Sequence, residues 1–297
     1  MRFIFVFLIL LSCGVSAQPI RPCVGELRSH TATASEDLFD IALKYQVAVD
    51  HLAYANGFPI TTLKVSAGTK VIIPTWRILP NHPPENGLVI NLAERGVYMF
   101  RKGKFVRFFP ISIGDEEAQK GRFATPTGNF HVIEKIKDPT WYPPAWAKDT
   151  KPVGPGPKNP LGDRWIGLSL PRTGIHGTDE PLNIGNSVTH GCLRTYPTLL
   201  HEIYDQVEVG WPAIIEYETF KVGKTSRGEI VFATFPDVYK KSNPLPGLRK
   251  KLGELGLLKS VKRQNLDSIA ELCLGFPVEV GSGKTVFEEV SQRLNWK

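Results

Sequence analysis

The sequence is poor in cysteine, in methionine and in long apolar runs, and these shortages restrict the class of protein. It has four cysteines and two methionines among 297 residues. Its longest uninterrupted apolar run is residues 3–11, far shorter than the ~20 residues that a helix needs to cross a bilayer. Several membrane-spanning helices are therefore excluded. Neither an internal repeat nor a low-complexity tract is evident.

The composition indicates a folded chain with a modest positive charge. The hydrophobic fraction of 42% and the aromatic fraction of 10% exclude a mainly disordered protein, and the length suits about two domains. The formal net charge is +7, and much of the excess lies after Tyr217. We do not expect nucleic acid as a partner for these basic clusters. Anionic glycan, peptide carboxylates, lipid headgroups or plain solvent remain open as their surroundings.

Residues 1–17 have the pattern of an export signal. Arg2 supplies the positive start, residues 3–11 supply the apolar segment, and Val15-Ser16-Ala17 supplies small residues before a cleavage point. An alternative pattern overlaps it, because Leu10-Leu11-Ser12-Cys13 resembles a lipoprotein signal in which Cys13 would be lipidated. Both readings predict that the mature protein works outside the cytoplasm.

Cleavage after Ala17 leaves three cysteines, Cys23, Cys192 and Cys273. In an oxidising compartment an odd number of thiols leaves at least one without a disulfide partner within the chain. Cys23 and Cys273 flank the mature chain and could pair, but the sequence leaves this open.

A small α+β unit is expected at residues 28–75. A helix over residues 35–45 begins with Ser35 as the expected N-cap, and a second helix over 49–56 ends at Gly57. Strand-like runs at 27–31 and 70–73 flank the pair. The predicted order is therefore strand, helix, helix, strand.

A β-rich body is expected after a linker at residues 76–86. The predicted strands are residues 88–92, 96–100, 105–113, 128–135, 165–169 and 213–217. One helix is expected after Thr195 as a cap. The prediction for residues 87–217 is a mainly β, sandwich-like or barrel-like domain. Residues 218–297 are expected to form a basic, partly helical C-terminal extension, with a helix at 265–275.

A proline-rich stretch interrupts the β-rich body. Seven prolines occur over residues 139–160, with Trp141, Tyr142 and Trp146 among them. Such a segment continues neither a helix nor a central strand, so it is expected on the surface. It is either a substrate-binding lid or a meander whose tryptophans only pack on the sheet.

The residues with the clearest chemistry are His176-Gly177 and the run Thr189-His190-Gly191-Cys192-Leu193-Arg194. An imidazole that takes the proton of a nearby thiol creates a strong nucleophile. Backbone N–H groups around Gly191 and Cys192 could stabilise an oxyanion. Three alternatives stay open from the spacing alone: a structural thiol, a zinc site of His176, His190 and Cys192, and a papain-type protease whose local signature is absent.

Residues 28–75 resemble a LysM module. The resemblance depends on the run 30–45, on Leu52-Ala53-Tyr54-Ala55-Asn56-Gly57 and on Gly68-Thr69-Lys70-Val71-Ile72-Ile73-Pro74. It departs from the family at Ala34-Ser35-Glu36-Asp37. The resemblance implies binding to glycans that contain N-acetylglucosamine, such as peptidoglycan.

The pattern from His176 to Arg194 resembles the signature of the L,D-transpeptidase (YkuD-type) catalytic domain, and the stretch Thr125-Pro126-Thr127-Gly128-Asn129-Phe130 supports it. The resemblance implies that Cys192 attacks a peptidoglycan stem peptide and forms a thioester. It implies His176 as the base, oriented by the carbonyl of Gly177. The N–H groups of His190, Gly191 and Cys192 would hold the oxyanion.

The same resemblance implies substrate binding by Arg194, and we expect Trp141 and Trp146 to bind substrate and exclude water. No metal and no cofactor are expected. The order of LysM and catalytic domain is similar to that of periplasmic enzymes of Gram-negative bacteria. The expected partner is peptidoglycan, and the acceptor amine comes from a second diaminopimelate or from a lysine of an envelope lipoprotein. A hydrolase that uses the same thiol and a non-catalytic wall-binding protein are the alternatives.

Overall fold

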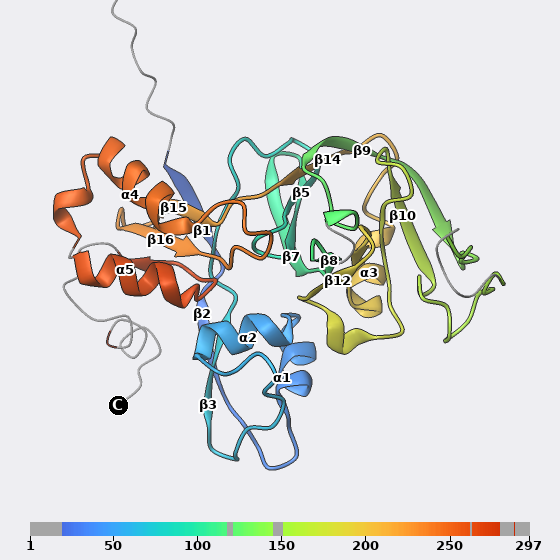
Figure 1. Ribbon diagram of the computed structural model, residues 1–297, viewed down its shortest axis with the longest axis horizontal. Coiled ribbons are helices and arrows are strands. Elements are labelled where there is room, and N and C mark those ends of the chain that lie inside the picture. The colour runs from blue at the N-terminus through green and yellow to red at the C-terminus, as the bar shows by residue number, and fades with distance from the viewer. Residues whose placement is uncertain (1–19, 118–120, 145–150, 262, 280–287, 289–297) are drawn as a thin grey trace, which may run out of the picture.

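The computed structural model describes residues 20–117, 121–144, 151–261, 263–279 and 288. The expected signal at residues 1–17, with Cys13, and the tryptophan Trp146 lie outside these ranges. Within them, a small helical unit and a helix-covered sheet pack beside a larger curved sheet (Figure 1). No helix in the described part of the chain is long and apolar enough to cross a membrane.

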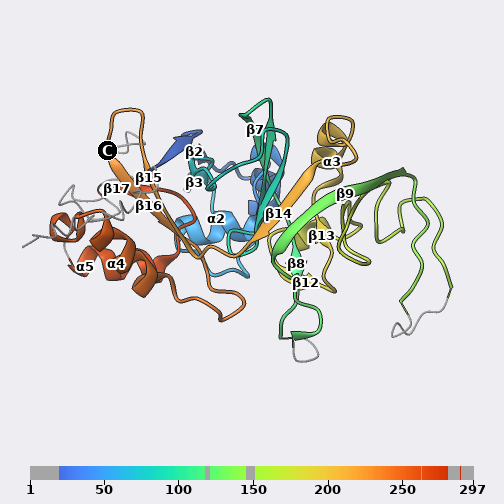
Figure 2. The same cartoon turned by 90° about the horizontal axis from the view of Figure 1, so that it is seen from above.

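The larger sheet has eight strands and mixed direction. Across the sheet these are β13 (Leu193–Arg194), β11 (Gly174–His176), β10 (Arg164–Leu168), β9 (Gly128–Lys137), β14 (Pro212–Glu216), β5 (Gly87–Asn91), β6 (Gly96–Arg101) and β7 (Lys104–Pro110). The pairs β13–β11 and β14–β5 are parallel, and the other pairs are antiparallel. Figure 2 shows how β9 curves away from β14 at one side of the sheet. The six predicted strands lie within a few residues of these bounds.

One face of this sheet holds the main apolar core. Alternate residues such as Leu88, Ile90, Val97 and Met99 point into it, as the two-residue period of a strand requires. Helix α3 (Pro197–Tyr204) and the short parallel pair β8 (Ile113–Gly114) and β12 (Ser187–Thr189) supply further core residues. The domain is therefore mainly β, as predicted. Of the two predicted arrangements, sandwich-like and barrel-like, the single curved sheet fits the barrel-like one better.

The start of α3 differs from the prediction. Its N-cap is Tyr196, with Pro197 in the first turn, and no side chain caps it. Thr195, the expected cap, instead donates its hydroxyl proton to the Pro110 carbonyl at 2.8 Å. A proline without an N–H suits the first helical position because that N–H needs no partner there.

The N-terminal unit consists of β2 (Leu27–Thr31), α1 (Leu38–Tyr45), α2 (Val49–Asn56) and β3 (Lys70–Pro74). Strands β2 and β3 pair antiparallel. The N-cap of α1 is Asp37 and not Ser35: Asp37 accepts the N–H of Asp40, and the Asp40 side chain accepts the N–H of Asp37. This reciprocal pair satisfies two backbone donors that a helix start otherwise leaves without partners.

The N-terminal unit packs directly on the larger sheet. Asp50 of α2 forms a buried ion pair with Arg95 at 2.5 Å, and the Tyr196 hydroxyl donates to the Val47 carbonyl at 3.2 Å. Ala48 belongs to the main core. The unit is therefore fixed to the sheet by buried contacts.

A second sheet joins both ends of the chain. Its order is β17 (Val278–Glu279), β16 (Ile230–Thr234), β15 (Phe220–Lys224), β1 (Arg21–Val24) and β4 (Arg77–Ile78), and β1 runs parallel to β15. Helices α4 (Pro244–Glu254) and α5 (Arg263–Leu272) share a core with it. Two short 3-10 turns, η2 (Pro181–Asn183) and η3 (Leu258–Ser260), complete the elements.

This second sheet changes two expectations about organisation. The range 76–86 is not a plain linker, because Trp76, Arg77 and Ile78 are buried and two of them form β4. The range 218–297 is more than a partly helical tail, since β15 and β16 pair with each other and β15 pairs with the N-terminal strand. Strand pairs separated by about two hundred residues leave no local pattern that a sequence reading could detect.

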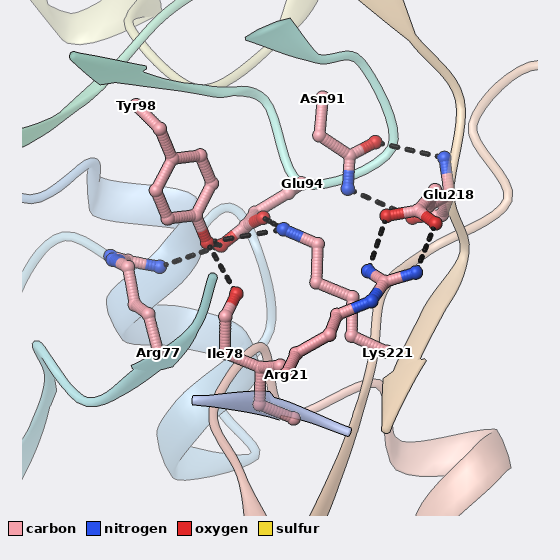
Figure 3. A network of polar contacts seen from close by, with 8 residues as sticks. All are labelled: Arg21, Arg77, Ile78, Asn91, Glu94, Tyr98, Glu218 and Lys221. Carbon is pink, nitrogen blue, oxygen red and sulfur yellow. Dashed lines mark hydrogen bonds and ion pairs between the residues drawn. The ribbon is translucent and has the colours of Figure 1, made fainter. Parts of the chain in front are cut away.

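A buried polar network joins the two sheets (Figure 3). The Lys221 side chain is fully buried, and its Nζ lies 2.7 Å from Glu94 Oε2. Glu94 also pairs with Arg77 at 3.1 Å and accepts the hydroxyl of Tyr98 at 2.7 Å. Buried charges remain stable only when they are paired in this way.

The predicted option of a Cys23–Cys273 disulfide does not appear in the described part of the chain. The Cys273 Sγ instead donates to the Ala270 carbonyl at 3.2 Å. Burial raises the pKa of Cys273 to about 11, so this thiol is protonated at neutral pH.

Candidate active site

His176 lies on β11, and Cys192 immediately precedes the neighbouring strand β13. In the parallel pair β11–β13, Ile175 lies opposite Leu193 and His176 lies opposite Arg194. Ile175 and Leu193 point into the main core. Because side chains alternate along a strand, His176 and Arg194 share the opposite face, and Cys192 immediately precedes β13. That the two side chains meet stays a prediction; what the structure shows is that their segments are direct neighbours.

The His176 imidazole is held in a fixed orientation. It is 3% exposed, and its Nδ1 lies 2.6 Å from the Gly177 carbonyl oxygen, so a proton on Nδ1 is donated there. This is the predicted contact with Gly177, and it leaves Nε2 as the basic nitrogen. Burial, helped by the Arg194 guanidinium, lowers the pKa of His176 to about 3.

Trp165 is a site residue that the sequence reading missed. Its ring stacks on His176 with centroids 5.7 Å apart and planes 26° apart, and its Nε1 donates to Glu134 at 3.0 Å. Residue 165 pairs with residue 176 across β10 and β11. A cross-strand pair of this kind needs the strand register, which no local signal in the sequence supplies.

The Cys192 thiol is half-buried and protonated at rest. Its Sγ donates to the Arg172 carbonyl oxygen at 3.3 Å. Burial raises the pKa of Cys192, while the Gly174 N–H and the Arg194 charge oppose that rise. We expected a sulfur already ionised by its imidazole partner. The structure instead has a neutral thiol and a neutral imidazole, so the proton has to move when substrate is present.

The turn before Cys192 is held by the Thr189 hydroxyl. That hydroxyl donates to the Cys192 carbonyl at 2.6 Å and accepts the Gly191 N–H at 3.2 Å. Gly191 has φ 111°, a conformation that favours glycine. Because the Gly191 N–H is engaged with Thr189, it is not presented to a substrate in this structure, contrary to its expected place among the oxyanion donors.

His190 and Arg194 make different contacts near Cys192. The exposed His190 ring packs edge-on against Phe123, with centroids 4.4 Å apart, and its pKa is lowered by burial and by Arg194. Arg194 pairs with Glu180 at 3.3 Å and lowers the pKa of His176, His190 and Cys192. One guanidinium therefore makes the potential positive at all three groups.

The proline-rich segment is anchored beside the site. The buried Asn159 side chain donates to the Pro139 carbonyl at 2.7 Å, and the backbone of Trp141 pairs with that of Val153. At the end of the segment, a Cβ added to Gly162 would lie 3.0 Å from the Gly177 Cα. The loop base thus touches the residue next to His176, whereas Trp165 supplies the described aromatic contact with the imidazole.

The geometry does not favour the zinc alternative. Within the described ranges, no three His, Cys, Asp or Glu side chains converge to hold a metal ion, and this includes His176, His190 and Cys192. What this region offers is a thiol, an imidazole whose Nδ1 contacts the Gly177 carbonyl, and a nearby cation. This is the arrangement of a cysteine acyl-transfer site.

Comparisons with known proteins agree with that class. The family model described as the L,D-transpeptidase catalytic domain, YkuD, matches residues 85–215. "Probable L,D-transpeptidase YcfS" of Escherichia coli is 32% identical over 219 residues, which cover 69% of this chain and 67% of the relative. "Probable L,D-transpeptidase YbiS" of Escherichia coli is 34% identical over 180 residues, which cover 57% of this chain and 56% of the relative.

Among solved structures, the catalytic domain of an E. faecium L,D-transpeptidase matches with 25% identity and a TM-score of 0.36, over 46% of this chain and 99% of that one. The assignment depends on the sequence matches. The chain belongs to the L,D-transpeptidase family with a YkuD catalytic domain, and it is an L,D-transpeptidase. A cysteine acyl-enzyme is typical of this family.

Proposed function

We propose that Cys192 is the nucleophile that carries the acyl group and that His176 is its base. The observation that supports this is the register of β11 and β13, in which His176 lies opposite Arg194 and Ile175 lies opposite Leu193, the residue after Cys192. In the free enzyme both groups are neutral, because burial lowers the pKa of His176 and raises that of Cys192. His176 therefore accepts the thiol proton as the carbon–sulfur bond forms, and not beforehand.

The donor step has a defined proton balance. The sulfur of Cys192 attacks the carbonyl of the third residue in a tetrapeptide stem, diaminopimelate, and His176 takes the thiol proton. His176 returns that proton to the nitrogen of the departing D-alanine, which leaves a thioester on Cys192. In the second step an amine attacks the thioester, His176 takes a proton from that amine, and the sulfur leaves and regains a proton.

The backbone around Cys192 and the guanidinium of Arg194 stabilise the charges of this reaction. The Gly191 N–H is engaged with Thr189, so the oxyanion role falls to the N–H of Cys192, with that of His190 as the second donor. Arg194 supplies a positive charge for a stem-peptide carboxylate, and Glu180 occupies it in the free enzyme. If the attacking amine belongs to a second diaminopimelate, the product is a 3-3 cross-link. If it belongs to a lysine of an envelope lipoprotein, that lipoprotein becomes attached to peptidoglycan.

Muropeptide analysis with matched variants tests the assignment. Wild type, C192A and C273A are each supplied with tetrapeptide-bearing peptidoglycan, and the products are separated and weighed. We expect new cross-links with wild type and with C273A, and none with C192A. Shortened stems without cross-links would indicate a hydrolase, and identical products from wild type and C192A would contradict an acyl-enzyme at Cys192.

We also propose that the protein is exported to the periplasm and that residues 28–75 bind peptidoglycan. Support comes from the export pattern in residues 1–17 and from the order β2, α1, α2, β3 of the N-terminal unit. Mass spectrometry of the mature N-terminus in periplasmic and membrane fractions tests export. We expect the mature protein to begin at Gln18. A mature protein that begins at a diacylglyceryl Cys13 would instead indicate a lipoprotein anchored in the membrane.

Glycan binding by the N-terminal unit is tested with two exposed apolar residues. Ile60, in the connection between α2 and β3, is 59% exposed, and Val209, in the YkuD domain, is equally exposed. Apolar side chains bind the flat faces of sugar rings. We expect I60S, and not V209S, to reduce sedimentation of the full chain with purified sacculi. Equal binding by all three proteins would count against a glycan site at this loop.

A further inference from the structure

Tyr239, in the segment after β16, lies inside the core of the YkuD domain although it lies well beyond the matched residues 85–215. Its side chain is 3% exposed. The hydroxyl donates to the Gly114 carbonyl at 2.8 Å and accepts the Thr125 N–H at 3.1 Å. The C-terminal segment thus supplies a polar group to the interior of the domain that holds the site.

Thr125 carries this contact to the turn that holds Cys192. The buried Thr125 hydroxyl accepts the Gly114 N–H at 2.9 Å and donates to the Gly191 carbonyl at 3.0 Å. Tyr239, Gly114 and Thr125 therefore form a closed set of hydrogen bonds, and the Thr125 hydroxyl links this set to Gly191. A Cβ on Gly114 would lie 1.9 Å from the Phe123 carbonyl, so the set has no space to shift.

The bond to Gly191 determines where the Cys192 N–H points. The Gly191 carbonyl and the Cys192 N–H belong to one peptide unit, and in a trans peptide these two groups point in opposite directions. Because Thr125 holds the carbonyl toward the interior, the N–H is directed away from the interior. That N–H is the oxyanion donor of the proposed function.

The position of Tyr239 is itself well determined. Its ring stacks on Tyr217 with centroids 5.4 Å apart and planes 7° apart, and its N–H donates to the Tyr217 hydroxyl at 2.8 Å. Tyr217 in turn donates to Asp237 at 2.7 Å, and Asp237 accepts the backbone N–H groups of Lys241 and Ser242. Lys240 pairs with Glu117 of the loop after β8 at 2.6 Å.

We propose that Tyr239 is a positioning residue that acts through Thr125 to orient the Cys192 N–H toward the oxyanion. The inference rests on the proposed role of Cys192 and gives the C-terminal segment a part in catalysis. Tyr239 does not touch the reacting atoms. Its effect should therefore appear only in reactions that create an oxyanion at the site.

Two reagents that both modify Cys192 distinguish a changed orientation of its N–H from a general loss of structure around the thiol. Iodoacetamide alkylates a thiolate by displacement at a saturated carbon and creates no oxyanion, whereas a carbapenem acylates it through a tetrahedral intermediate that does. Rates at Cys192 are measured by mass spectrometry of its peptide in the full chain. For Y239F we expect acylation about tenfold slower and alkylation within about twofold of wild type, since the loss of a whole oxyanion donor costs about 10²–10³.

Matched variants complete the experiment. T125V should reproduce the Y239F result if Y239F does not fold, and T125S, which keeps the hydroxyl, should restore the wild-type ratio of the two rates. Y196F is the control, because it removes another buried tyrosine hydroxyl, which donates to the Val47 carbonyl. If Y239F slowed alkylation and acylation equally, or left the acylation rate unchanged, the inference would be overturned. Unchanged acylation of C192A would instead refute the proposed function.

Discussion

His176 and Arg194 are direct partners across the parallel pair of β11 and β13. The guanidinium of Arg194 acts together with burial to lower the pKa of His176 to about 3. A cation beside a base usually weakens that base. Here it also lowers the pKa of the Cys192 thiol against the effect of burial. Arg194 therefore lowers the pKa of both groups: His176 stays unprotonated at neutral pH, and Cys192 ionises more easily than burial alone would allow.

The first prediction concerns pH. Because the pKa of His176 lies near 3, its imidazole stays unprotonated as the pH falls from 8 to 5. We expect the rate of Cys192 acylation by a carbapenem to show no descending limb with a midpoint near 6.5, the ordinary pKa of histidine. Rates are measured at constant ionic strength, with free cysteine as the control for changes in the reagent. A tenfold loss per pH unit below 6.5 would contradict the buried, neutral imidazole.

The second prediction concerns the charge of Arg194. In R194A the pKa of Cys192 should rise further and the pKa of His176 should also rise, because the charge lowers both. The pH dependence of iodoacetamide alkylation at Cys192 reports the first change, and its midpoint should move upward. R194K keeps the charge and should stay close to wild type. An unchanged midpoint in R194A would show that the guanidinium does not act on the thiol.

The third prediction concerns Thr189. T189V removes the hydroxyl that binds both the Cys192 carbonyl and the Gly191 N–H. The turn before Cys192 then loses both hydrogen bonds. A buried hydrogen bond of this kind contributes about 1 kcal/mol, which corresponds to a several-fold change in reaction rate. We expect acylation of Cys192 to slow by about five- to tenfold. T189S keeps the hydroxyl and is the control, so equal slowing of T189S and T189V would argue against this role.

The strands are the part of the fold that the sequence predicts well. The alternation of apolar residues places strands at 88–92 and 96–100, and β5 and β6 begin and end within about a residue of those ranges. His176 and Cys192 each precede or follow an apolar residue that has to face the core, Ile175 and Leu193. Two adjacent strands with that pattern bring their other side chains to one face.

Contacts between distant parts of the chain are what the sequence could not predict. Trp165 stacks on His176 because of strand register, and Tyr239 binds Thr125 across 114 residues of chain. The choice of Asp37 over Ser35 as the N-cap of α1 has the same origin, since both residue types suit a cap. The packing of Leu38 in the core of the N-terminal unit selects between them.

The fourth prediction concerns the buried network of Figure 3. Glu94 is the carboxylate that pairs with both Lys221 and Arg77, so E94Q leaves these two buried cations facing a neutral amide. K221M leaves Glu94 still paired with Arg77. We expect E94Q to lower the free energy of unfolding by about 3–5 kcal/mol and K221M to lower it by less. Urea unfolding followed by fluorescence measures both values.

The surface ion pair between Arg107 and Glu202 serves as the control for that experiment, because both partners are partly exposed. E202Q should change the free energy of unfolding by less than about 1 kcal/mol. If K221M proves as costly as E94Q, the attraction between Lys221 and Glu94 matters more than the repulsion between the cations.

The fifth prediction concerns the contact between the N-terminal unit and the YkuD domain at Gly185. Gly185 has φ 100°, and a Cβ there would lie 2.0 Å from Asp50 Oδ1, whose carboxylate pairs with Arg95. Gly210 has a similar φ of 92°, but a Cβ there would meet nothing within 4 Å. Both alanine variants carry backbone strain of roughly 1–2 kcal/mol. G185A alone must also displace Asp50, which adds about 1–3 kcal/mol. Thermal unfolding should therefore show a clearly lower midpoint for G185A than for G210A, and equal midpoints would mean that α2 does not pack on this turn in solution.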